Sequence, residues 1–195
     1  AYFMGRGVLD SRHHLSITMP TGEELWKNTA VVLGVGTRMQ PHQQRWGVDK
    51  ELKIIRIDLS QEEMSRITRP EIGIVGDATS VLNALAEALP KHNSIRHSRR
   101  EELDEARART TKKLAPVAPQ LAYVEAIRNG LPENGICIDE LTQGSYISRN
   151  AMPAYSPRTF IGSGYQGTLG WGYATGLGVK VARPDLPVLS INGDG

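Results

Sequence analysis

The sequence predicts an α/β fold, and two observations lead to this class. Short apolar runs that end at glycine or aspartate alternate with segments whose apolar residues recur at helical spacing. Strands that alternate with helices form parallel sheets with helices on their faces. A charge-dense stretch separates two such series. We therefore expect two doubly wound parallel-sheet units, the second of which is truncated.

The first unit is expected to cover residues 1–92. Its strands are predicted over residues 29–36, 53–58 and 72–75, which are short, apolar and rich in β-branched side chains. A short helix is predicted over residues 21–28. Ser60 and Asp77 follow the second and third strands and have side chains that cap helices, and the helix after Asp77 should end at Pro90.

Residues 93–119 are expected to form a linker with an exposed helix. The stretch 99–107 interleaves acidic and basic side chains, and residues 115–119 contain two prolines. The interleaved acidic side chains argue against an arginine-rich arm for nucleic acid, so we interpret the stretch as a solvated helix.

The second unit is expected to cover residues 120–195. Strands are predicted over residues 135–139, 158–161 and 187–192, and helices over residues 120–131, from Thr142 onward and over 173–183. A glycine-rich loop over residues 162–172 leads into the last helix.

The composition excludes several classes of partner. A formal net charge of +2, from 23 basic and 21 acidic residues, gives no field that attracts nucleic acid or an anionic membrane. No apolar run approaches the ~18 residues that span a bilayer, and the first residues lack the pattern of a signal peptide. The single cysteine, Cys137, lies in an apolar run and cannot form an internal disulfide. We expect a cytoplasmic protein without nucleic-acid or membrane partners.

The glycine-rich loop is the first candidate binding segment. Its five glycines let the backbone approach a ligand closely, and the N–H groups at the start of the following helix suit an anion. Close packing of the helix against the sheet also explains such a run. The loop by itself leaves both interpretations open.

The triplet Gly193-Asp194-Gly195 is the second candidate. It follows a predicted strand directly, and open α/β sheets bind ligands at the carboxyl ends of their strands. A carboxylate there is a hard oxygen ligand, which suits Mg²⁺ that bridges two phosphates. An ordinary β-turn is the alternative, since Asn-Gly and Asp-Gly are common turn dipeptides.

Two stretches resemble the thiamine-diphosphate enzymes of the acetolactate synthase group in order and spacing. They are residues 158–178, RTFIGSGYQGTLGWGYATGLG, and residues 183–195, RPDLPVLSINGDG. The resemblance implies that Gly193, Asp194 and Gly195 open the diphosphate-binding motif of the family. It also implies that Asp194 is a Mg²⁺ ligand.

The same resemblance assigns three further cofactor-binding residues. The backbone carbonyl of Gly167 is expected to accept from the 4′-amino group of the cofactor. Leu169 stands where the family has a bulky apolar residue that supports the bent cofactor. Gln143 is expected to reach the diphosphate from the opposite side.

The first half of the chain resembles the central domain of this family, through Gly5-Arg6-Gly7 and the segments 33–38, 57–59 and 75–77. In some members this domain binds FAD or ADP, and in others it is empty. The candidate nucleotide-binding residues are Gly34, Gly36, Thr37, Arg38, Asp58 and Asp77. Asp58 suits a ribose hydroxyl and Arg38 suits a phosphate. An empty fold is an equal alternative, since the third glycine of the dinucleotide fingerprint is absent.

The resemblance implies a whole enzyme that decarboxylates a 2-keto acid as its small-molecule substrate, ligates the product to a second carbonyl, or does both. Thiamine diphosphate and Mg²⁺ are the implied cofactors, and FAD or ADP stays open. The family takes its activating glutamate from an amino-terminal domain of the partner subunit. We therefore expect a homodimer or homotetramer, no catalytic residue within this chain, and no activity of the chain alone, as an internal piece of that enzyme. A non-catalytic nucleotide-binding module, for FAD or ADP, is the alternative.

Overall fold

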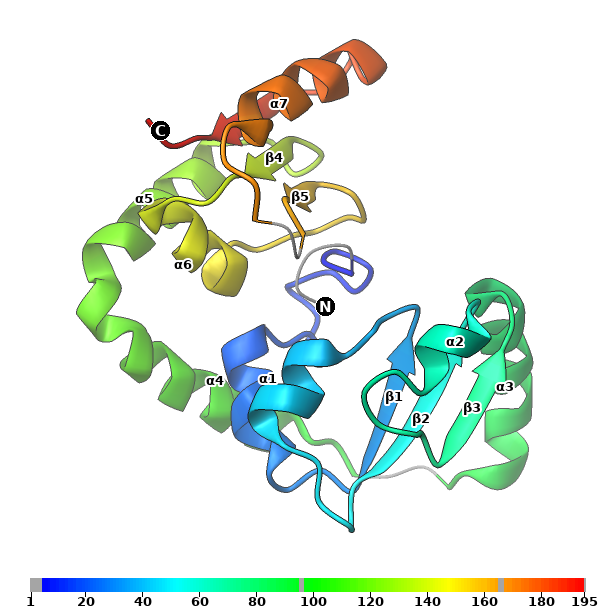
Figure 1. The fold of residues 1–195 in the computed structure, drawn as a ribbon. Coiled ribbons are helices and arrows are strands. Elements are labelled where there is room, and N and C mark those ends of the chain that lie inside the picture. The colour runs from blue at the N-terminus through cyan, green and yellow to red at the C-terminus, as the bar shows by residue number, and fades with distance from the viewer. Residues whose placement is uncertain (1–4, 95–96, 165–166, 195) are drawn as a thin grey trace. The chain divides into compact units, whose positions relative to one another are not determined.

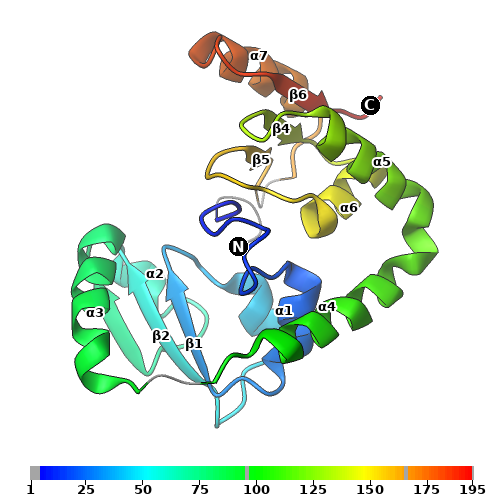
Figure 2. The same ribbon diagram turned by 180° about the vertical axis from the view of Figure 1, so that it is seen from behind.

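The computed structural model describes residues 5–94, 97–164 and 167–194 of the chain. The chain forms two compact units: an N-terminal unit, Glu23–Arg99, and a C-terminal unit, in which Ala1–Gly22 packs with Arg100–Gly195. Each unit contains a three-stranded parallel sheet with flanking helices (Figure 1), and Figure 2 shows the same ribbon from behind. The predicted α/β class with two parallel-sheet units is confirmed.

The N-terminal sheet has the order β1-β2-β3. Its strands are β1 (Val31–Val35), β2 (Lys53–Asp58) and β3 (Ile72–Val75), all parallel. Helix α1 (Met19–Trp26) precedes β1, α2 (Gln61–Met64) follows β2, and α3 (Ala78–His92) follows β3. The predicted caps are confirmed, because the side chains of Ser60 and Asp77 accept backbone N–H groups of the turns that they begin.

The N-terminal unit differs from the sequence prediction at two places. The prediction that the helix after Asp77 ends at Pro90 is wrong, because α3 continues to His92. A proline removes one helical hydrogen bond, and this loss is tolerated in a last turn that is about to end. The second difference is a π-helical turn, η1 (His42–Trp46), which the apolar spacing of the sequence does not indicate.

An aromatic cluster of Trp26, His42 and Trp46 packs within the N-terminal unit. The rings of His42 and Trp46 meet edge-on with a centroid distance of 4.4 Å, and those of Trp26 and Trp46 with one of 5.3 Å. The Trp26 Nε1–H donates to the carbonyl oxygen of Gly47 at 2.8 Å. Burial lowers the pKa of His42 to about 4, so this side chain is neutral at pH 7.

The C-terminal sheet has the order β5-β4-β6. Its parallel strands are β4 (Ile136–Asp139), β5 (Phe160–Gly162) and β6 (Val188–Ile191). The central strand β4 is buried along its whole length. The core beside it consists of Val124, Leu131, Cys137, Met152, Ala154 and Phe160.

The C-terminal unit is rich in helices. They are α4 (Arg100–Leu114), the 3-10 turn η2 (Ala115–Val117), α5 (Ala118–Gly130), α6 (Gln143–Ala151) and α7 (Trp171–Ala182). α4 is the expected charged helix, but it buries Leu103, Ala106 and Thr110 and is not wholly solvated. Within the described residues, no helix has the length and apolar character needed to cross a membrane.

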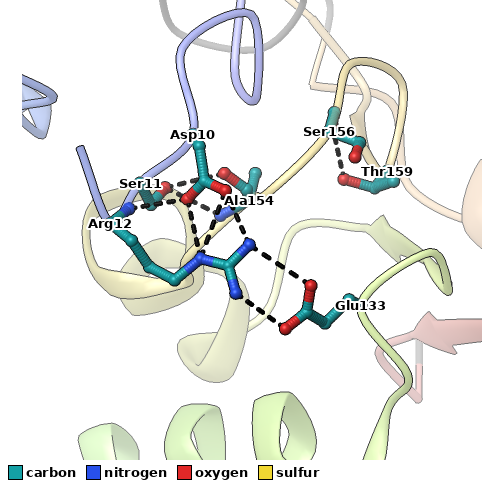
Figure 3. Close-up of polar contacts among 7 residues, drawn as sticks. All are labelled: Asp10, Ser11, Arg12, Glu133, Ala154, Ser156 and Thr159. Carbon is teal, nitrogen blue, oxygen red and sulfur yellow. Dashed lines mark hydrogen bonds and ion pairs between the residues drawn. The ribbon is translucent and has the colours of Figure 1, made fainter.

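The first residues of the chain dock on the C-terminal unit, and we call residues 5–18 the N-terminal arm. Figure 3 shows Ser11 facing Ala154, where the Ser11 Oγ donates to the Ala154 carbonyl and the Ala154 N–H donates back to that Oγ, both at 2.9 Å. The Arg12 guanidinium lies between Asp10 and Glu133, each at 2.7 Å (Figure 3).

Arg6 adds a further attachment of the arm. Its Nη1 donates to the carbonyl oxygens of Ser148 and Arg149 in the last turn of α6, both at 2.9 Å. Its guanidinium also lies over the ring of Phe160, 4.3 Å from the ring centroid. Residues 5–22 thus pack with the C-terminal unit, whereas the expected domain limits of 1–92, 93–119 and 120–195 place them with the first sheet. Those limits stay a prediction.

Replacing Gly7 by alanine should destabilise the C-terminal unit. The backbone of Gly7 has φ 78°, and an added Cβ would lie 2.0 Å from the carbonyl oxygen of Ser156. The left-handed conformation alone costs other residues about 1–2 kcal/mol. We expect the free energy of unfolding to fall by at least that amount, measured by urea denaturation followed by circular dichroism.

Gly178→Ala is the matched control for this substitution. Gly178 lies in α7, and an added Cβ would meet nothing within 4 Å. Its stability should be unchanged or higher by up to ~1 kcal/mol, since alanine favours a helix. Equal stability of the two variants would contradict the docked arm.

The stability of the protein should also fall as the pH is lowered from about 6.5 to about 4. The ordinary pKa of histidine is 6.5, whereas that of His42 in the fold is about 4. Between these values the unfolded state binds the proton more readily, so acid favours unfolding. His42→Phe should flatten this part of a plot of unfolding free energy against pH.

The control here is His97→Phe, at an exposed position. This variant should keep the pH dependence of the wild type. The assignment to His42 is wrong if the two variants give the same profile.

Candidate functional site

The carboxyl ends of β4, β5 and β6 meet at one edge of the C-terminal sheet, because the strands are parallel. Asp139 of β4 pairs in register with Gly162 of β5 and with Ile191 of β6. Three segments leave this edge: the β4–α6 loop, the glycine-rich loop before α7, and the turn after β6. The cofactor-binding candidates of the C-terminal unit lie in or next to these segments.

The β4–α6 loop ends at a capped helix start. The Thr142 Oγ1 accepts the backbone N–H of Ser145 at 3.1 Å, and Gln143 is the exposed first residue of α6. The start of a helix carries partial positive charge and favours an anion. Gln143 therefore stands where an anionic group is stabilised, and its contact with a cofactor stays a prediction.

Asp139 is buried and fixes α6 to β4. Its carboxylate accepts from the Ser148 Oγ at 2.6 Å and from the Arg149 Nε at 2.9 Å. Burial raises the pKa of Asp139, while the hydrogen bonds from Ser148 and Arg149 act in the opposite direction. This carboxylate is committed to the fold.

Glu140 is the next residue and is also buried, with 2% of its surface exposed. Its two carboxylate oxygens accept the backbone N–H groups of Gly170 at 2.7 Å and of Gly172 at 2.8 Å. These N–H groups belong to the start of α7. The N–H groups of Gly170 and Gly172 are thus engaged by a protein carboxylate and are not free for a ligand anion.

The glycine-rich loop places two predicted residues at this edge. Gly167 has φ 59°, and an added Cβ would lie 2.9 Å from the Leu141 Cδ1 of the β4–α6 loop. Leu169 is 62% exposed. Both residues thus belong to a loop that leaves this edge, and their contact with a cofactor stays a prediction.

Asp194 lies beyond the end of β6 and is exposed, as is Gly193. Gly195, the third residue of the predicted motif, lies outside the described residues. In the described parts of the chain, no group of three or more His, Cys, Asp or Glu could hold a metal ion. Mg²⁺ usually takes one or two carboxylates together with phosphate oxygens and waters, so a single Asp194 carboxylate fits a metal held jointly with a diphosphate.

The edge of the N-terminal sheet is held by a buried arginine that the sequence analysis missed. Arg56 is 1% exposed, and its guanidinium donates to the carbonyl oxygens of Glu63, Met64 and Thr37 and to Asp58 Oδ2. Asp58 also accepts the Ser60 N–H at 3.1 Å through its other oxygen. Both carboxylate oxygens of Asp58, the residue predicted to bind a ribose hydroxyl, thus have hydrogen-bond partners within the protein.

The other predicted nucleotide-binding residues, except Gly36, also have structural partners. Arg38 forms an ion pair with Glu63 at 3.0 Å, and Asp77 caps α3. Gly34 is a close-packing position, since an added Cβ would lie 2.3 Å from the Met39 Sδ. Thr37 Oγ1 accepts the N–H of Met39, whereas Gly36 faces open space. Their role toward a nucleotide stays a prediction.

Cys137 is not placed for nucleophilic chemistry. It lies in β4 and is 1% exposed. Burial, and to a smaller extent Asp139, raises the pKa of its thiol to about 12, so the thiolate is not populated at neutral pH.

Sequence reasoning missed Glu140 and Arg56, which organise the two sheet edges. Glu140 directly follows the apolar strand β4 and Arg56 lies within the apolar strand β2, and a charged side chain at such a position is a sequence signal. The residue types alone do not reveal their partners.

Two protein-family models match the chain. Residues 1–85 match "Thiamine pyrophosphate enzyme, central domain", and residues 142–195 match "Thiamine pyrophosphate enzyme, C-terminal TPP binding domain".

Similar proteins cover most of the chain. A 2-hydroxyacyl-CoA lyase of Arabidopsis thaliana is 28% identical over 209 residues, which cover 98% of this chain and 36% of the relative. A probable 2-ketoarginine decarboxylase of Pseudomonas aeruginosa is 28% identical over 199 residues, covering 98% and 35%. A probable acetolactate synthase large subunit of Methanocaldococcus jannaschii is 33% identical over 160 residues, covering 74% and 26%.

The chain thus spans between 26% and 36% of the length of these three relatives. The matched regions follow one another in the order of a central domain and a cofactor-binding domain. The second region includes both the glycine-rich loop and the Gly193-Asp194-Gly195 triplet, on which the resemblance is based. The chain belongs to the thiamine pyrophosphate enzymes, as an acetolactate synthase-like member.

Proposed function

We propose that this chain forms part of a thiamine-diphosphate- and Mg²⁺-dependent enzyme that acts on a 2-keto acid by decarboxylation, carboligation or both. One observation carries the proposal: the carboxyl edge of the β5-β4-β6 sheet brings the start of α6, the glycine-rich loop and the turn after β6 together. Open α/β sheets bind phosphorylated cofactors at this edge.

The residues divide into two groups around the cofactor. Asp194 would hold Mg²⁺ through its exposed carboxylate, with Gly193 and Gly195 allowing the diphosphate to approach the backbone. The capped start of α6, with Gln143, would face the diphosphate from the other side.

The glycine-rich loop would serve the pyrimidine end of the cofactor. The carbonyl of Gly167 would accept a hydrogen bond from the amino group, and Leu169 would pack against the ring face. Thiamine diphosphate supplies a carbon nucleophile and an electron sink for the departure of carbon dioxide. The residues of this chain bind and orient that group, and we assign them no proton transfer.

The names of the relatives support the reaction class. They include a lyase, a decarboxylase and acetolactate synthases. We infer that the substrates are 2-keto acids in which the bond between the keto carbon and the carboxylate is cleaved. The activating glutamate would come from a partner subunit, which makes a homodimer or homotetramer part of the proposal. A cytoplasmic location also belongs to the proposal.

The alternative is a non-catalytic module that binds FAD or ADP in the N-terminal unit. The open space at Gly36 favours it, whereas the internal partners of Asp58 and Arg38 do not. Saturable binding of ADP or FAD that Asp58→Asn abolishes, without binding of thiamine diphosphate, would establish this alternative.

Asp194→Asn should weaken Mg²⁺-dependent binding of thiamine diphosphate by roughly tenfold or more, because an amide replaces the anionic metal ligand. Isothermal titration of the protein with thiamine diphosphate, in Mg²⁺ and again in EDTA, measures this loss. The wild type should lose affinity in EDTA, and the variant should respond little to Mg²⁺.

Asp185→Asn is the control, since Asp185 is an exposed aspartate that pairs with Arg183 before β6. It should bind like the wild type. The metal assignment is contradicted if Asp194→Asn and Asp185→Asn bind equally well.

A further inference from the structure

Helix α7 has no cap from its own sequence. Its first flanking residue, Gly170, has φ 73° and no side chain to accept a hydrogen bond, and the first turn contains no acidic residue. A helix start exposes N–H groups that need acceptors. Here the acceptor is Glu140, which lies thirty residues earlier in the chain, and its carboxylate receives the N–H groups of Gly170 and Gly172.

The same carboxylate lies against the third segment of the edge. An added Cβ at Gly172 would stand 2.7 Å from Glu140 Oε2 and 2.5 Å from Asn192 Oδ1. Asn192 precedes the Gly193-Asp194 turn, and its Oδ1 accepts from the Ser190 Oγ at 2.9 Å. Glu140, Gly172 and Asn192 therefore form one packed contact, which joins the ends of β4 and β6 to the start of α7.

The anion position at the start of α7 is filled by the protein itself. A glycine-rich loop before a helix can offer its N–H groups to a phosphate. Here two of them are used by a side chain that is 2% exposed. A diphosphate at this edge cannot use these two N–H groups, whereas the capped start of α6 and the turn after β6 lie at the same edge.

We propose that Glu140 is a positioning residue, which fixes the Gly167–Gly172 turn so that it serves the pyrimidine side of the cofactor and not its diphosphate. This inference rests on the proposed function, since it assumes that thiamine diphosphate is the ligand. Glu140 acts through the backbone of Gly170 and Gly172 and does not touch the reacting atoms.

Amide hydrogen exchange of the unliganded protein tests the positioning directly. In Glu140→Ala, the amides of Gly170 and Gly172 should exchange at least about tenfold faster than in the wild type, since both lose their acceptor. Glu140→Gln keeps the size and one acceptor oxygen, so one of the two amides should stay protected. It also serves if the alanine variant does not fold.

Glu133→Ala is the matched control. Glu133 is an exposed glutamate of the same unit that pairs with Arg12, and its loss should leave both glycine amides protected. Unchanged exchange of Gly170 and Gly172 in both Glu140 variants would overturn the proposal.

Ligand binding tests the division of the cofactor site. Glu140→Gln should lower the affinity for thiamine diphosphate in Mg²⁺ by about tenfold, which is the effect of losing a residue that supports a binding site from behind. The affinity for inorganic diphosphate in Mg²⁺ should be nearly unchanged. An equal loss for both ligands would overturn the assignment to the pyrimidine side. If the wild type binds thiamine diphosphate in neither EDTA nor Mg²⁺, the proposed function is refuted, and the assignment of the turn to the pyrimidine side falls with it. The exchange rates of Gly170 and Gly172 are independent of this outcome, because they report on the turn alone.

Discussion

The two acidic residues at the end of β4 hold the candidate site together. Side chains of successive residues in an extended chain point to opposite sides, so Asp139 reaches α6 while Glu140 reaches α7. A buried carboxylate is costly unless it is hydrogen-bonded, and here both are satisfied. Both carboxylates are therefore engaged within the fold, and the exposed Asp194 is the carboxylate that we propose for the metal.

In the N-terminal unit a buried cation, not a buried anion, binds the backbone around the sheet. Arg56 near the end of β2 collects carbonyl oxygens from the loop after β1 and from α2, together with the Asp58 carboxylate. A guanidinium has several donors in a planar arrangement, so one side chain can satisfy several acceptors. The consequence is functional, because a nucleotide at this edge would compete with these internal contacts.

The N-terminal arm belongs to one unit by its spatial contacts and to the other by its place in the sequence. Residues 1–85 match the central domain of the family, but the first of them are attached to the cofactor-binding part through Arg6, Ser11 and Arg12. Gly7 is needed there because the backbone passes close to Ser156. A substitution in the arm would thus act on the sheet that carries Asp194 and not on the sheet that follows it in sequence.

The sequence by itself determined the α/β class, the strand positions, the caps at Ser60 and Asp77, and the family. These features depend on spacing within a few residues or on ordered motifs, and both are visible along the chain. The domain limits and the roles of the cofactor-binding residues stay predictions. Only the tertiary structure decided that Glu140 caps α7, that Arg56 engages Asp58 and that the arm docks beside Ala154. The contacts of Glu140 and of the arm join residues thirty or more positions apart, so they arise from packing and not from local pattern. Asp58 is only two residues from Arg56, and what the sequence does not show is that Arg56 is buried and also binds the Thr37 carbonyl of another segment.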